Sequence, residues 1–187
     1  MQNGLVSMRK KPSYVDFDRD NYKWKSTINY KEESHLYEIG RGQQGVLTCE
    51  PYKSELHPLW RFKTVEEAQL SCNRIYMKYL EYVEDEDFVG MDMCRKYLHM
   101  GFTRSRRYWN HSSGRKWTRM KNGEWAILPF DRTEDRFYQG SLIFQRYWKM
   151  VREDTTYLDM KRDFKIWKEK HLKFREEYGE WRKRNHR

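Results

Sequence analysis

The stretch TVEEAQLSCNRIYMKYLEYVEDEDFVGMDMCRKYLHMG, residues 64–101, decides the fold class. It opens with Thr64 and Glu67, a capping box in which each side chain can satisfy a free backbone N–H of the other residue. Apolar residues follow at the three- and four-residue spacing of one helix face: Ala68, Cys72, Ile75, Tyr79, Leu80 and Val83. The spacing predicts a helix that runs to about Glu84.

A second helix is predicted directly after the first. The acidic run at 84–87 places negative charge at its N-terminus, where the helix macrodipole favours it. The apolar spacing continues through Phe88, Met91, Cys94 and Leu98. Gly101 is typical of the residue that follows a helix end. We therefore expect the second helix to stop at Gly101.

Short β elements are expected on both sides of this helical pair. The dipeptide Asn122-Gly123 is the strongest short-range signal for a two-residue β-hairpin, and it predicts a hairpin over residues 117–128. Upstream, Gly and Pro residues surround two short apolar runs, Val46–Cys49 and Leu59–Phe62, which favour short strands or extended segments.

Two further capping boxes predict the starts of two later helices. Asp131 with Glu134 precedes one helix, and Thr156 with Asp159 opens the last one. The last helix carries an aromatic seam at heptad spacing, formed by Met160, Phe164, Trp167, His171, Phe174 and Tyr178. This seam can close against the chain's own helices or against a second copy, so the sequence leaves the oligomeric state open.

These elements together predict a mostly α fold with small β elements, an α+β class. We expect an extended N-terminal arm over residues 1–30, a single compact helical domain over 31–178 and a basic C-terminal tail over 179–187. The chain contains eight Trp and fourteen Tyr, and aromatic rings bury about 150–250 Å² each. We therefore expect an aromatic core, with the arm held in place by its own aromatic residues.

Composition narrows the location and the chemistry. No apolar run approaches the ~18 residues that a spanning helix needs, and the opening residues lack the apolar region of a secretory signal. Cys49, Cys72 and Cys94 are far apart and include no C-x-x-C pair. Such cysteines are typical of reduced thiols, so we expect a cytoplasmic protein with no membrane partner.

The positive charge is concentrated in one part of the chain. The formal net charge is +10, and the 31 residues between Asp92 and Glu124 contain no carboxylate. Nearly all of the surplus lies in this acid-free window, in Arg95, Lys96, Arg104, Arg106, Arg107, Arg115, Lys116, Arg119 and Lys121. A concentrated positive field favours an anionic partner.

Within the window, basic residues alternate with aromatic ones. Cations attract phosphates and flat rings stack on bases, so the pattern predicts a nucleic-acid or polyphosphate site. The predicted site contains Thr103, Arg104, Arg106, Arg107, Tyr108, Trp109, Asn110, His111, Arg115 and Lys116, with Arg41 of the glycine-rich segment at 40–45. The structural alternative is that the rings belong to the core and the arginines pair with the carboxylates at 84–87.

No established catalytic or metal-binding motif occurs. Asp92, Arg95 and His99 share one helical face, which we interpret as a surface salt-bridge row rather than a catalytic set. Three ligands at zinc spacing are absent, and there is no Walker loop or nucleophile elbow. We therefore predict no catalytic residue, no metal and no cofactor, and lean against an enzyme.

Five motifs resemble a known family. They are G-R-G-x-x-G-V-L from Gly40, E-P-Y-K-S-E from Glu50, H-P-x-W-R-F from His57, G-M-D-M-x-R-K from Gly90 and M-G-F-T-R-x-R-R-Y-x-N-H from Met100. The pattern is similar to a family recorded as a domain of unknown function in tailed phages, bacteria and some fungi. The resemblance implies a small soluble protein and a phage origin. A protein encoded by a phage would be located in the cytoplasm of the host. The resemblance implies no activity.

The leading functional hypothesis therefore depends on the residues alone. It is a non-enzymatic protein that binds the phosphate backbone of DNA or RNA with weak sequence preference, with Tyr108 or Trp109 stacking on a base or sugar. One alternative is an enzyme or sensor for a small phosphorylated ligand such as a nucleotide. Another is an adaptor that docks an acidic host protein through the same surface.

Overall fold

The computed structural model of the chain describes residues 6–7, 11–12, 15–18, 20–40, 45–132 and 134–185. Within them the helices are α1 (Tyr52–Leu56), α2 (Val65–Glu84), α3 (Phe88–Asn110), α4 (Asp135–Glu153) and α5 (Thr155–Asn185). The strands are β1 (Val6–Ser7), β2 (Trp117–Arg119) and β3 (Trp125–Ile127), and the 3₁₀ helices are η1 (Ser34–Leu36), η2 (Val46–Thr48) and η3 (His57–Leu59). The predicted α+β class is confirmed.

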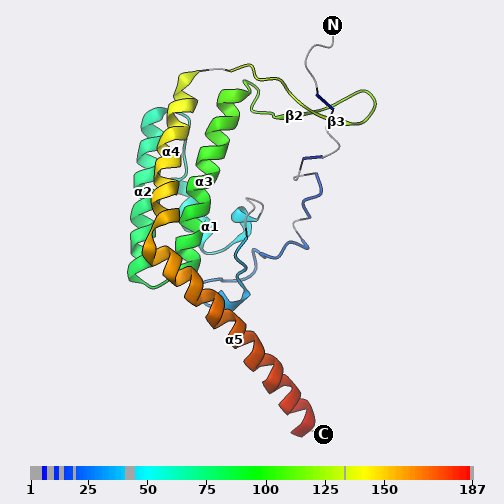
Figure 1. The fold of residues 1–187 in the computed structure, drawn as a ribbon, viewed down its shortest axis with the longest axis vertical. Helices are drawn as coiled ribbons and strands as arrows, with labels where there is room; N and C mark the ends of the chain where they lie inside the picture. Colours follow the sequence, from blue (N-terminus) through cyan, green and yellow to red (C-terminus); the bar gives the residue numbers. More distant parts are fainter. Residues whose placement is uncertain are drawn as a thin grey trace.

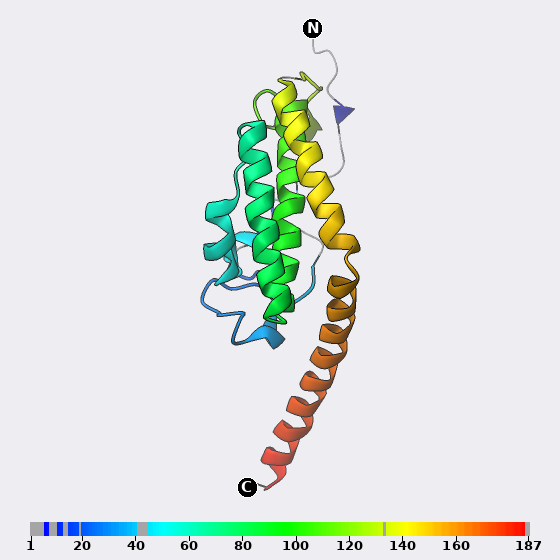
Figure 2. The ribbon, with the colours of Figure 1, turned by 90° about the vertical axis from the view of Figure 1, so that its left-hand side faces the viewer.

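Three long helices form the body of the molecule. Helices α2, α3 and α4 lie side by side, and α3 packs most closely on α4 (Figure 1). The antiparallel sheet, in the order β1-β3-β2, lies beside the end of the bundle where α3 finishes. Helix α5 leaves the opposite end and extends well beyond the body (Figure 2). None of the described helices is long and apolar enough to span a lipid bilayer.

Helix α2 begins and ends as the sequence predicts. The Thr64 side chain accepts a hydrogen bond from the backbone N–H of Glu67 at 3.1 Å. Glu67 in turn accepts from the N–H of Lys63, so both side chains of the box satisfy a free donor at the helix start. The apolar face of α2 is buried through Ala68, Cys72, Ile75, Tyr79 and Tyr82.

The predicted end of α3 is wrong. The helix continues past Gly101 to Asn110. Gly101 lies where α3 meets α4, and a Cβ atom at this position would stand 2.2 Å from the Phe144 ring. The glycine therefore permits close approach of two helices and does not end one.

The first of the two upstream runs is predicted wrongly, and the second is predicted in part. Val46–Thr48 forms the 3₁₀ helix η2. Leu59 ends the 3₁₀ helix η3, but Trp60 after it is extended, with φ −86° and ψ 105°. Gly45 precedes η2 with a φ of +80° and lies against the Tyr22 and Trp24 rings.

Residues 20–40 supply much of the aromatic core. Trp24, Tyr30 and Tyr37 are almost completely buried. Trp24 stacks on Tyr37 with the ring centroids 5.3 Å apart, and Tyr37 meets Phe164 of α5 edge to face. The expected aromatic core is therefore formed between α3, α5 and an extended segment that carries few regular hydrogen bonds of its own.

The two later capping boxes are wrong. The Asp131 carboxylate accepts from the backbone N–H and the hydroxyl of Ser112, while α4 starts after Glu134, whose side chain makes no cap. At α5 the cap is Asp154, which accepts from the N–H of Thr156 at 2.7 Å. At α4 the predicted capping carboxylate is engaged by Ser112, and at α5 the neighbouring Asp154 takes the backbone donor of Thr156 that the predicted capping box would satisfy.

The hairpin is confirmed, with a longer loop than predicted. Arg119 pairs with Trp125, and the backbone N–H of Met120 donates to the carbonyl of Glu124. Three residues therefore form the loop, and Gly123 takes the left-handed conformation with φ +85°. A type I turn followed by a left-handed glycine is the usual geometry of three-residue hairpin loops.

The aromatic seam of α5 is covered only in its first half. Lys168 donates to the carbonyl of Tyr37, and Arg175 contacts the His35 ring. Past this point α5 continues through the predicted tail to Asn185, with Phe174 66 % exposed and Tyr178 51 % exposed. The segment 33–39 thus takes the place that a second copy would need along the first half of the seam.

Candidate nucleic-acid interface

The predicted phosphate-binding residues lie at one end of the bundle. Residues 103–110 form the last two turns of α3, and residues 111–116 lead from its end into β2 (Figure 1). The acidic run at 84–87 lies at the other end of this helix. Because α3 has 23 residues and rises about 1.5 Å per residue, the two ends are about 34 Å apart. The structural alternative, in which the arginines pair with residues 84–87, is therefore wrong.

The first two cations of the acid-free window point inward. Asp92 is completely buried, and it accepts from Arg95 Nε at 2.8 Å and from Lys96 Nζ at 3.1 Å. The hydroxyls of Tyr37 and Tyr157 also donate to this carboxylate. Arg95 and Lys96 thus share one carboxylate within the core, and their side chains are directed away from a phosphate-binding face.

This buried network corrects a prediction. The row formed by Asp92, Arg95 and His99 is not on the surface: Asp92 is buried and His99 stacks on Trp148 with centroids 4.6 Å apart. Burial alone would raise the pKa of Asp92, but the charges of Arg95 and Lys96 overcome this effect. They hold the pKa of Asp92 well below its usual range. The carboxylate is therefore a fixed anion that joins α3 to α5 and to the segment around residue 37.

The later cations of the window have a different environment. Across the described residues, no ion pair to an Asp or Glu side chain is formed by Arg104, Arg106, Arg115, Lys116, Arg119 or Lys121. Arg115 and Lys116 are exposed, while Arg104, Arg106 and Arg107 are half-buried along α3. Within the part of the chain that the structure describes, the charges of these six cations are therefore not neutralised by carboxylates in direct contact.

Trp109 is the centre of a cluster of rings and guanidinium groups. Its ring lies 4.6 Å from that of Tyr138 on α4. The Arg106 guanidinium is 5.2 Å from the Trp109 ring centroid, and the Arg132 guanidinium is 4.5 Å from it. Both distances are within the range of cation–π attraction, so the two arginines are held beside a half-buried ring.

Tyr108 packs against rings from two neighbouring segments and keeps part of its side chain exposed. Its ring lies 5.8 Å from Phe62 and 5.6 Å from Phe137, and it closes against Gly114 of the following loop. It therefore packs the end of α3 against its neighbours. The Thr103 hydroxyl donates to the carbonyl of Met100, which leaves it facing its own helix.

Several buried polar atoms at this end lack a partner among the described residues. They are Arg104 Nε, Asn110 Oδ1 and His111 Nδ1. Arg104 and Asn110 belong to the last two turns of α3, and His111 follows directly after the helix in an extended conformation. Buried polar atoms usually have a hydrogen-bond partner, so this concentration marks a place where a ligand or ordered water fits.

The connection after the hairpin completes the site, and the sequence did not reveal it. The double hydrogen bond from Ser112 to Asp131 ties the loop after α3 to the loop before α4, and it lowers the pKa of Asp131. Arg132 is thereby brought beside Trp109, and Phe130 lies beside Arg132. The only sequence signal for Arg132 was its positive charge. Asp131 and Glu134 lie close to it in the sequence, so Arg132 falls outside the acid-free window.

Gly40, at the start of the glycine-rich segment, contacts α3 at Lys96 and not at the cationic end of the helix. Arg41 lies outside the described residues. The carbonyl of Gly40 accepts from Lys96 Nζ at 2.6 Å. Lys96 is eight residues before Arg104, about 12 Å along the helix. The described end of the glycine segment is therefore held beside the buried network.

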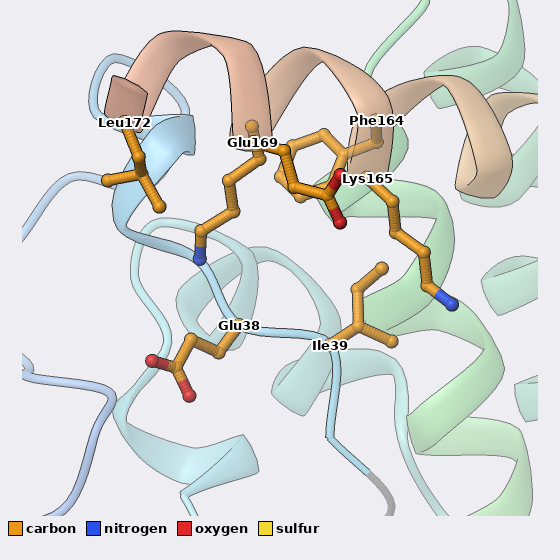
Figure 3. A pocket seen from close by; sticks show the side chains of 7 residues that line it. Glu38, Ile39, Phe164, Lys165, Glu169 and Leu172 are labelled. Atoms are coloured by element: carbon orange, nitrogen blue, oxygen red, sulfur yellow. The ribbon is translucent and has the colours of Figure 1, made fainter. Parts of the chain in front are cut away.

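A separate groove lies where α5 leaves the body. It has a volume of about 300 Å³, and its apolar side chains Ile39, Phe164 and Leu172 are flanked by Glu38, Lys165, Lys168 and Glu169. Ile39 and Phe164 point toward each other across it (Figure 3). The groove carries both signs of charge and lies far from the cationic end of α3. Within the described residues, no group of His, Cys, Asp and Glu side chains is placed to hold a metal ion.

Comparisons with known proteins identify the family. Residues 20–167 match the family described as Domain of unknown function (DUF4385), and the chain therefore belongs to it. The match begins just before the aromatic residues of the extended segment and ends within α5. No curated protein and no solved structure matches the chain.

Proposed function

We propose that this member of the DUF4385 family binds the phosphate backbone of a nucleic acid at the free end of α3. The observation that carries the proposal is a group of cations with no carboxylate partner in the described residues, two of which, Arg106 and Arg132, lie against the Trp109 ring. The cations are Arg104, Arg106, Arg115, Lys116, Arg119, Lys121 and Arg132, and they come from α3, from the loop and hairpin that follow it and from the loop before α4.

Physical chemistry favours a polymer over a single small anion. Cations distributed over three elements can each neutralise a different phosphate, and every neutralised phosphate releases a counterion. The contacts are to backbone oxygens and not to base edges, so weak sequence preference follows.

The experiment is a binding titration at increasing salt. Fluorescence anisotropy with labelled oligonucleotides gives the association constant between ~50 and ~200 mM salt, where each phosphate contact contributes a slope of about −0.9 on duplex DNA. We expect a steep linear decrease of log K against log salt. An affinity that is unchanged over this range would contradict the proposal.

A matched pair of variants tests the location. The double variant Arg115→Gln, Lys116→Gln removes two exposed cations from the proposed face, and we expect the salt slope to fall in magnitude by about 1.8 on duplex. Lys170→Gln, Lys173→Gln removes the same charge from exposed positions on α5 and should leave the slope unchanged. Equal effects of the two variants would place the binding elsewhere.

A further inference from the structure

Phe130 is a large apolar side chain held at the surface. It is 60 % exposed and lies in the connection between β3 and α4. Its neighbour Asp131 is fixed by two hydrogen bonds from Ser112, and the backbone N–H of Asp131 donates to the carbonyl of Asn110. The ring also meets His111 edge to face at 5.4 Å. Phe130 is therefore an exposed ring on a backbone that is anchored from several sides.

The Arg132 guanidinium contacts two rings of this end. Its central carbon is 4.5 Å from the Trp109 ring centroid and 5.9 Å from that of Phe130. Arg132 itself is exposed, and no ion pair to a carboxylate holds it within the described residues. A planar, delocalised group thus lies against aromatic faces, held by them and not by an anion.

We propose that Trp109 and Phe130 form a stacking site for one unpaired nucleobase, and that the Arg132 guanidinium occupies this site until nucleic acid binds. The inference rests on the proposed function and specifies its substrate as single-stranded nucleic acid. A base is planar and delocalised like the guanidinium, so it can replace that group on the same rings. Arg132, once displaced, is free to pair with the adjacent phosphate.

The substrate class follows from the geometry of stacking. A base in a duplex already stacks on its neighbours, so it offers no free face to Phe130 unless it is first unpaired. An unpaired base offers both faces, and stacking on one aromatic ring strengthens single-strand binding by about tenfold. The surrounding cations act on either form of nucleic acid, so the preference for single strands comes from the rings.

The test compares three probes of equal length, ~12 nucleotides, which is within the site size of single-strand binders. They are a thymidine oligomer, an abasic oligomer with the same number of phosphates and a duplex. We expect the wild-type protein to bind the thymidine oligomer about tenfold more tightly than the abasic one. In Phe130→Ala this ratio should fall severalfold, because only the Trp109 ring remains, while affinity for the abasic oligomer stays unchanged.

Phe174→Ala is the matched control, because Phe174 is 66 % exposed on α5 and remote from the site. It should keep the wild-type ratio. Arg132→Ala tests the occupancy of the site: it should bind the abasic oligomer more weakly and yet keep at least the wild-type ratio between the two single strands. Loss of that ratio in Arg132→Ala would show that the guanidinium is part of the base site and does not stand in for the base.

The two proposals fail in different ways. Salt-dependent binding of all three probes with equal affinity would overturn the stacking site and leave backbone binding intact. Absence of binding to every probe would overturn the proposed function and the stacking site together. Both exposed-ring variants alter surface residues, so circular dichroism and a thermal midpoint close to wild type are expected for each.

Discussion

The variant Asp92→Asn tests the buried network that joins the three parts of the core. Asp92 is the only carboxylate in contact with Arg95 and Lys96 among the described residues. It also accepts from the hydroxyls of Tyr37 and Tyr157, which belong to the extended segment and to α5. Asparagine has nearly the same shape, so the substitution removes the charge without opening a cavity.

The magnitude follows from the burial of the pair. Removing one partner of a buried ion pair costs about 3–5 kcal/mol, because the remaining charge is left without compensation. Here two cations lose their anion, and the amide nitrogen of asparagine would face donors. We expect a loss of about 4 kcal/mol, a large part of the 5–15 kcal/mol that usually separates folded from unfolded proteins.

Urea unfolding followed by circular dichroism measures this loss, with a lower midpoint and an unchanged slope. The matched control is Asp159→Asn, because Asp159 and Arg162 have the same i, i+3 spacing on a helix with side chains 60 % and 62 % exposed. Exposed pairs contribute about 0–1 kcal/mol. If Asp92→Asn cost no more than this control, the network would not be the buried charge cluster described here.

The pH dependence has a definite sign. The folded-state pKa of Asp92 is lowered, so its contribution is present above the ordinary value of 3.8 and is lost as the pH falls through the folded pKa. The difference between wild type and Asp92→Asn should therefore shrink only in strong acid. A second variant, Asp92→Asn with Lys96→Met, removes one of the stranded cations and should regain part of the lost stability.

Three further predictions concern other parts of the fold. Gly101→Ala places a methyl group 2.2 Å from the Phe144 ring, and the overpacking should cost at least about 1–3 kcal/mol in urea unfolding. Thr64→Ala removes the hydrogen bond to the N–H of Glu67 and should cost about 1 kcal/mol by the same measurement, whereas Thr64→Ser should not. Arg175 has only donors and contacts His35 Nε2, so that histidine is neutral. Burial lowers the pKa of His35, with His171, Arg175 and Lys168 adding to the effect and Glu33 opposing it. Protection of the last turns of α5 in hydrogen exchange should therefore decrease as the pH falls below about 6.5, and this dependence should be absent in His35→Gln.

The parts of the fold that depend on nearby residues could be predicted from the sequence. Helix α2 and its cap were predicted because the apolar spacing and the Thr64–Glu67 pair act within a few residues of each other. The hairpin was predicted because Asn122-Gly123 sets its own turn, although the loop proved one residue longer. The end of α3 was missed because the reason for Gly101 is a ring of α4, more than forty residues away.

The buried network was missed for a related reason. A charged row at helical spacing is usually solvated, and nothing near Asp92 in the sequence indicates burial. The partners that bury it, Tyr37 and Tyr157, are 55 and 65 residues away. Only the packing of α5 and the extended segment against α3 brings them there.

Some residues of the candidate site could be predicted from the sequence, and others could not. The acid-free window identified the cations from Arg104 to Lys116, because charge is visible without a fold. Phe130 and Arg132 lie outside that window, and Arg132 reaches Trp109 through the Ser112–Asp131 hydrogen bonds. A carboxylate that the sequence presents as a capping residue thus positions the exposed ring and the guanidinium.

Spacing from Asp92 explains why one cationic window has two different roles. On a helix a carboxylate reaches the residues three and four positions ahead, and these are Arg95 and Lys96. Arg104 is twelve positions ahead, about 18 Å along α3, and no other acid occurs before Glu124. The first two cations therefore form ion pairs in the core. The later cations of α3 have no acidic residue within reach on the same helix. For Arg104 and Arg106, which make no ion pair within the described residues, we propose an external polyanion as the partner.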